Sequence, residues 1–72
     1  MNLLNEITAN LQEWNYKVLD DGTTMHSRRF SGKIHHQLQN NFTSAFSSFN
    51  KNDQTIIVSC FKNYTNIVIF DE

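Results

Sequence analysis

Residues 55–70 read TIIVSCFKNYTNIVIF, and this stretch decides the fold. Both of its halves are rich in β-branched and aromatic residues, which favour strands, and the polar residues between them are typical of a tight turn. The stretch therefore predicts two antiparallel strands, 55–61 and 66–70, joined by a turn at 62–65. Apolar residues occupy odd and even positions alike, so both faces of this hairpin are apolar. One face can pack on helices, and the other needs a second copy or a partner to cover it.

The first residues of the chain have a helical pattern. Their apolar members recur at intervals of three and four: Leu3, Leu4, Ile7, Leu11 and Trp14. This spacing predicts an amphipathic helix over 2–14, with Asn2 available to cap its start.

A second helical stripe lies in the middle of the chain. It consists of Ile34, Leu38, Phe42, Ala45, Phe46 and Phe49. The stripe predicts a longer helix over about 32–49, followed by a polar connection at 50–53. Ser31 is a suitable residue to cap the start of this helix.

A further hairpin is expected between the two helices. Strands at 16–19 and 24–30 would flank the turn 20–23, where Gly22 can adopt positive φ. The residues of 24–30 show little apolar alternation, so an edge strand and an ordered loop stay open for this segment.

The predicted order of elements is helix, hairpin, helix, hairpin (αββαββ). This order indicates a small α+β domain with a mostly antiparallel sheet and helices on one face. The 72 residues leave room for one core, so we expect a single domain over 1–72. So short a chain is marginally stable, and Cys60, the only cysteine, can form no internal disulfide. A homodimer therefore stays open beside a monomer.

Composition argues against several classes of protein. No segment approaches the roughly 20 apolar residues of a membrane span, and the N-terminus does not resemble a signal peptide. A single thiol fits a reducing compartment, so a cytoplasmic location and no membrane contact are expected. No cysteine and histidine spacing suits zinc, and adjacent His35 and His36 point about 100° apart on a helix. We predict no metal, no cofactor and no enzymatic activity, because no catalytic constellation is present.

Charge is sorted along the chain. Between Gly22 and Asn52 there is no acidic residue, and all 7 acidic residues lie in the flanks. The central segment instead carries cations near the start of the second helix, which predicts an anion-facing patch of Arg28, Arg29, Lys33 and His36. Helix starts favour anions, and arginine presents paired donors to carboxylate or phosphate. The competing interpretation is a solvated basic face that binds nothing.

The outer face of the last hairpin is the second candidate surface. Its predicted members, for self-association or for stacking on unpaired bases, are Ile57, Phe61, Tyr64, Ile67 and Ile69. Taken together, the sequence indicates a small non-enzymatic binding module, of the kind found among phage-type accessory proteins. The module would dock on a host protein through the basic patch and regulate it. The alternative is a nucleic-acid-binding protein that uses the same patch and the aromatic residues of the hairpin.

Overall fold

The computed structural model describes residues 3–42 and 44–71. Its elements, in chain order, are α1 (Leu3–Thr8), β1 (Asn15–Val18), β2 (Thr24–Ser31), α2 (Lys33–Asn41), β3 (Phe46–Lys51), β4 (Gln54–Cys60) and β5 (Tyr64–Asp71). The five strands form one sheet in the order β1-β2-β5-β4-β3, and every neighbouring pair is antiparallel. The α+β class and the antiparallel sheet predicted from the sequence are confirmed.

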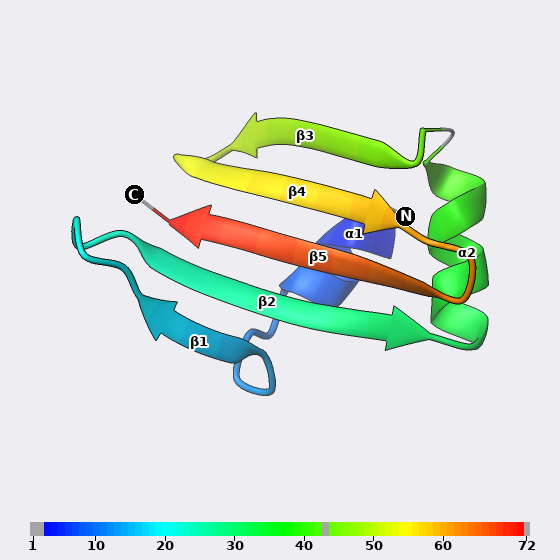
Figure 1. Cartoon of the computed structure of the whole chain (residues 1–72), viewed down its shortest axis with the longest axis horizontal. Helices are drawn as coiled ribbons and strands as arrows, with labels where there is room; N and C mark the ends of the chain where they lie inside the picture. The colour runs from blue at the N-terminus through cyan, green and yellow to red at the C-terminus, as the bar shows by residue number, and fades with distance from the viewer. Residues whose placement is uncertain (1–2, 43, 72) are drawn as a thin grey trace.

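The helices occupy two different places around the sheet (Figure 1). α1 lies behind the sheet, whereas α2 crosses the end at which β2 stops and β5 starts. Both nevertheless supply the same core, because Leu4 of α1 and Leu38 of α2 are buried together with side chains of the sheet. The expectation of two helices lying on one face therefore describes α1 but not α2.

The second helix is shorter than predicted, and a strand replaces its last part. α2 ends at Asn41, and Phe46–Lys51 forms β3, so the order is αββαβββ rather than αββαββ. β3 and β4 are joined by Asn52 and Asp53, whose φ angles are 51° and 64°. Two consecutive positive φ angles are typical of the tight turn that joins antiparallel strands. The Ser- and Asn-rich segment before this turn has low helix propensity, and pairing with β4 makes it a strand.

The first helix also ends early. α1 stops at Thr8, although the apolar spacing continues to Trp14. The side chain of Asn10 accepts a hydrogen bond from the backbone N–H of Gln12 at 3.0 Å, and such local bonds compete with the helix. Trp14 is still buried, with its ring 5.7 Å from that of Phe30 in an edge-to-face contact. The predicted cap at Asn2 lies outside the described residues.

β2 is an inner strand and not a loop. Each of its residues from Thr24 to Ser31 is paired with β5, and the first four are also paired with β1. The strand predicted over 24–30 is confirmed, and its weak apolar pattern is overridden by pairing on both sides. The turn before it has Gly22 at φ 88°, as its composition predicts.

The core lies on one face of the sheet, which we call the covered face. It contains Leu4, Trp14, Phe30, Leu38, Ile56, Val58, Ile67 and Ile69. The prediction that Ile67 and Ile69 lie on the outer face is wrong, because these side chains are only 0 % and 1 % exposed. Residues of a strand point alternately to opposite faces, so Val68 and Phe70 take the outer positions instead. Both sets of side chains are apolar. A shift of one residue in the pairing register of the strand would move each set to the other face of the sheet.

Candidate functional site: the open face of the sheet

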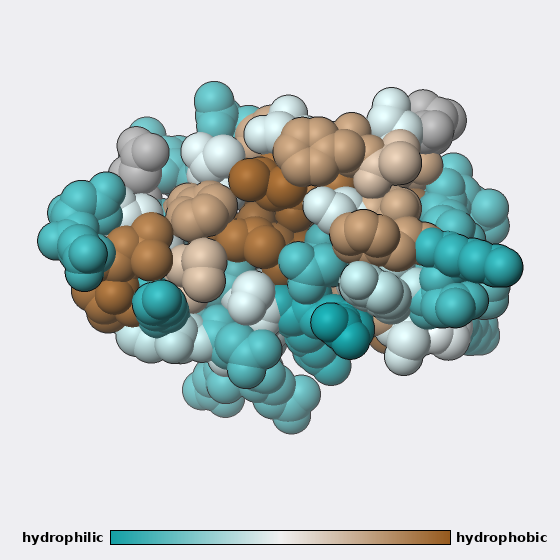
Figure 2. Space-filling view, in the orientation of Figure 1, coloured by the Kyte–Doolittle hydropathy of each residue, from teal (hydrophilic) through white to brown (hydrophobic). Residues whose placement is uncertain are grey.

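The face of the sheet opposite the core, the open face, has an apolar centre. Val68 pairs with Ile57 on one side, and Phe70 pairs with Met25 on the other. We call these four half-buried side chains the apolar patch. None of them belongs to the core or packs against it, and both described helices lie elsewhere. Figure 2, which looks onto this face, shows apolar side chains gathered across its middle.

Phe46 extends the open face toward the edge of the sheet. It lies on β3 opposite Ser59 of β4, and its side chain is 60 % exposed. Phe46 therefore presents an apolar side chain to solvent beside the apolar patch. The sequence pattern had assigned this residue to a helix core, so the site prediction missed it. The missed signal was the pair Asn52 and Asp53, which marks a hairpin.

An aromatic stack lies on the same face near α2. The rings of Phe61 and Tyr64 are 4.7 Å apart with an interplanar angle of 25°, and the guanidinium carbon of Arg29 lies 4.4 Å from the centre of the Tyr64 ring. We call Arg29, Tyr64 and Phe61 the stacked corner. Phe61 is 48 % exposed, so the outer end of the stack is accessible. A hydrogen bond of 2.8 Å from the Phe61 N–H to the Tyr64 carbonyl closes the turn that brings the two rings together.

α2 is held against this turn by a buried histidine. His35 is 1 % exposed, and its Nδ1 lies 2.8 Å from the hydroxyl of Thr65. Its Nε2 is 3.1 Å from the backbone carbonyl of Lys62. A carbonyl can only accept, so Nε2 carries a proton and donates it. These bonds fix the stacked corner relative to α2, which makes His35 a structural residue.

The structure does not bring the four predicted patch residues together. Arg28 and Arg29 are neighbours on β2, so their side chains leave opposite faces of the sheet. The guanidinium carbon of Arg28 lies 5.0 Å from the centre of the Phe30 ring, on the covered face. Lys33 and His36 are exposed on α2. The residue that precedes α2 as its cap is Gly32, without a side-chain hydrogen bond, so Ser31 does not cap the helix.

Charges are distributed unevenly along the length of the molecule. Arg28, Arg29, Lys33 and Lys62 lie in the half of the sheet that α2 crosses, whereas the other end carries Asp20, Asp21, Asp53 and Asp71 together with Lys17 and Lys51. Within the described part of the chain, no carboxylate forms an ion pair with these cations. At the acidic end, the backbone N–H of Thr23 donates a 2.9 Å hydrogen bond to Asp21, which lowers the pKa of that carboxyl.

The open face itself carries no negative charge among the residues described. By strand register its charged members are Lys17 and Arg29, and the rest are apolar, hydroxyl or carboxamide side chains. Nothing in the described ranges gathers three side chains of the types that hold metal ions. Cys60 is a free, half-buried thiol. The arrangement can therefore bury apolar surface and attract an anionic group.

Comparison with known proteins does not indicate a function for the open face. No family model matches the chain, and no curated protein or solved structure shows significant similarity to it. Neither described helix is long and apolar enough to cross a membrane.

Proposed function

We propose that this protein is a non-enzymatic binding module that docks on a protein partner through the open face. The supporting observation is the apolar patch, which is contiguous, lies outside the core and has only cations among its charged neighbours. Soluble monomers rarely leave large contiguous apolar patches uncovered unless the patch binds something. The complementary partner presents apolar side chains bordered by carboxylates. Regulation of a host protein in the cytoplasm, in the manner of a phage-type accessory protein, is the role that we propose for this docking.

The energetics of such a contact depend on a few anchors. Burial of apolar surface contributes about 25 cal/mol per Å², and binding energy concentrates in arginine and large aromatic residues. The stacked corner supplies both types: Arg29 and the exposed Phe61 lie beside the patch. Because Tyr64 already holds the guanidinium by stacking, Arg29 loses less side-chain entropy when it meets a carboxylate. Of the four residues of the predicted basic patch, Arg29 is thus the one that we expect to contribute most to docking.

Affinity capture with matched variants tests this proposal. The tagged protein, the Ile57→Ser/Val68→Ser variant and the exposed-helix control Asn40→Ser are incubated with nuclease-treated and untreated lysate of the source cell. We expect the wild type and the control to capture the same protein regardless of nuclease, and the double variant to lose it while keeping its circular dichroism spectrum. Equal capture by the folded double variant would refute docking through the open face.

Binding of single-stranded nucleic acid is the second candidate, and the stacked corner is the observation that favours it. Unpaired bases stack on aromatic side chains of open sheets, and arginine contributes through its planar cation. A gel shift with single- and double-stranded DNA and RNA at two salt concentrations distinguishes this candidate. Binding to single strands that weakens steeply with salt and is lost in Phe61→Ala would support it. The absence of any shift at micromolar protein would exclude it.

A second copy of the chain is the remaining occupant of the open face. Sedimentation over a concentration series measures this directly for the wild type and for Ile57→Ser/Val68→Ser. A dimer that the double variant abolishes would replace the heterologous partner in our proposal, whereas a monomer at all concentrations leaves the open face free for another protein.

A further inference from the structure

The molecule has a second concave surface, between α1, the end of α2 and β3. This hollow has a volume of about 590 Å³ and is lined by Leu3, Leu4, Asn5, Asn41, Phe42, Phe49 and Lys51. Such a volume is typical of small-molecule sites, which occupy roughly 300–1,000 Å³. Phe49 and Lys51 alternate with the open-face residues of β3, so the hollow lies on the covered side of the sheet. It is therefore separate from the surface in the proposed function.

The shortness of α1 explains why the hollow exists. A helix of 6 residues is only about 9 Å long, at 1.5 Å per residue, and cannot cover a five-stranded sheet. The core under it is centred on β2, β5 and β4. β3, at the edge of the sheet, keeps only a partial cover, and its Phe49 is half-buried.

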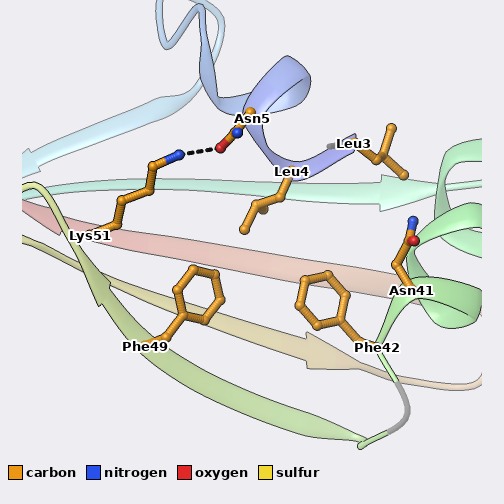
Figure 3. A pocket seen from close by; sticks show the side chains of 7 residues that line it. All are labelled: Leu3, Leu4, Asn5, Asn41, Phe42, Phe49 and Lys51. Atoms are coloured by element: carbon orange, nitrogen blue, oxygen red, sulfur yellow. Dashed lines mark hydrogen bonds between the residues drawn. The ribbon is translucent and has the colours of Figure 1, made fainter. Parts of the chain in front are cut away.

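One wall of the hollow carries apolar side chains, and polar side chains make up much of the rest of its lining. Figure 3 shows the rings of Phe42 and Phe49 side by side, with Leu4 of α1 facing them across the hollow. Leu3 lies at the α2 end of the same wall. The two rings are half-buried and Leu4 is almost fully buried, so the apolar surface that a ligand can reach is chiefly that of Phe42 and Phe49.

The rim of the hollow is polar and positively charged. Nζ of Lys51 donates a hydrogen bond to Oδ1 of Asn5, which holds the ammonium group at one end (Figure 3). An ammonium group has three donors, so two are left for a ligand. Asn41 lies at the other end, where its own amide already donates to the carbonyl of Gln37 at 3.0 Å. Among the residues that the structure describes, the lining contains no carboxylate, and Lys51 is its charged member.

We propose that this hollow binds an amphiphilic carboxylate, that is, a ligand with an apolar body and one terminal carboxylate. The body lies along the solvent-facing sides of the Phe42 and Phe49 rings, and the carboxylate accepts charge-assisted hydrogen bonds from Lys51. Charge complementarity selects the anion: an alcohol of equal length meets the same apolar surface but no ionic partner, and a cationic amphiphile is repelled. A small hydrophilic anion would leave the phenylalanine rings uncovered.

Titration with three amphiphiles of equal chain length tests the site. Dodecanoate, dodecanol and dodecyltrimethylammonium are added, below their micelle-forming concentrations, to the ¹⁵N-labelled protein, and amide shifts are followed by NMR. We expect dodecanoate to bind at least tenfold more tightly than the other two, with shifts concentrated in 3–8, 41–42 and 46–51. Equal affinity for all three amphiphiles, no binding, or shifts centred on the open face would overturn the proposal.

Variants of Lys51 separate the contribution of its charge to ligand binding from its contribution to folding. Lys51→Met should weaken dodecanoate binding about tenfold and leave dodecanol binding unchanged, while Lys51→Arg should keep most of the affinity. Lys17→Met, which removes a lysine from the open face, is the matched control and should bind as the wild type does. If Lys51→Met unfolds, the comparison of Lys51→Arg with the wild type decides: a tenfold loss with arginine, where the charge is kept, would refute the assigned ion pair.

Discussion

The two sides of β5 differ sharply in burial. On one side, Thr65, Ile67 and Ile69 are 0 %, 0 % and 1 % exposed, and on the other, Val68 and Phe70 are half-buried. The two sides are equally apolar in sequence, so hydrophobicity does not distinguish them. The difference is what packs on each side: α1, the Trp14 segment and, through Leu38 and His35, α2 pack on the covered face, and no described element packs on the open face. One side of the strand is part of the core, and the other is not covered by any described element.

Shortening a side chain on the covered side of β5 and one on its open side should give the largest difference in the free energy of unfolding. Ile67→Ala removes a fully buried side chain and should lower the free energy of unfolding by about 3 kcal/mol. Val68→Ala removes partly solvated atoms and should cost less than about 1 kcal/mol. Urea unfolding followed by circular dichroism measures both. Similar losses for the two variants, at any one protein concentration, would mean that the open face is covered in solution.

Substitution of the buried His35 should give the next largest loss in the free energy of unfolding. His35→Ala removes both ring contacts, so the Lys62 carbonyl loses its partner and the Thr65 hydroxyl keeps only its 3.8 Å contact with Sγ of Cys60. We expect a loss of about 2–3 kcal/mol in the free energy of unfolding, since orphaned buried polar groups keep their desolvation cost. The exposed neighbour offers a control, because His36→Ala should change stability by less than about 0.5 kcal/mol. A small effect of His35→Ala would show that α2 is held by packing alone.

Arg28 and Arg29, which lie on opposite faces of the sheet, allow the two faces to be compared in partner binding. Arg29→Ala removes the guanidinium from the stacked corner on the open face, and Arg28→Ala removes one from the opposite side. Partner affinity, measured by calorimetry once the partner is captured, should fall about fivefold or more for Arg29→Ala, in line with roughly 1 kcal/mol for such a contact. Arg28→Ala should leave it unchanged. The reverse order would place the binding surface on the covered side.

The smallest expected effect on stability comes from Asp21, which lies in the turn between β1 and β2 and on neither face of the sheet. The Thr23 backbone N–H donates to the Asp21 carboxylate and holds its pKa below the ordinary 3.8. A lowered pKa in the folded state stabilises the fold above pH 3.8, and this contribution is lost as the pH falls through the folded-state pKa. NMR titration of the side-chain carboxyl carbon should show the lowered midpoint in the folded protein and not in urea. Equal midpoints in the two states would contradict the hydrogen bond.

Much of the fold follows from sequence pattern, and the failures have physical causes. The hairpin of β4 and β5 and the turn at Gly22 were predictable because turn residues and β-branched runs act locally, whereas β2, which the pattern left open between an edge strand and a loop, is an inner strand because it pairs with β1 and β5. β3 was not predictable, because Phe46 and Phe49 are three residues apart, a spacing that fits one face of a helix as well as the two opposite faces of a strand. The sequence also does not reveal which face of β5 is buried, because isoleucines alternate with valine and phenylalanine and the packing of α1, Trp14 and α2 decides which set is covered.

The candidate site was predictable only in part. Ile57, Phe61 and Tyr64 do lie on the open face, whereas Ile67 and Ile69 belong to the core. The stacked corner depends on register: Arg29 lies diagonally across from Tyr64 because β2 and β5 are paired, which no spacing along the chain reveals. The separation of Arg28 from Arg29 follows from strand alternation once that segment is known to be a strand.

The uneven distribution of charge along the 34 Å length of the molecule has a kinetic consequence. The four cations of the α2 half face an opposite end where four aspartates outnumber Lys17 and Lys51, so a net charge of −1 hides a permanent dipole that rotates the protein in the field of an approaching charged body before the two touch. An acidic body is met first by the α2 end, and a basic one by the opposite turns. Orientation during diffusion thus raises the rate of productive encounters at low ionic strength, and salt slows association while hardly changing dissociation.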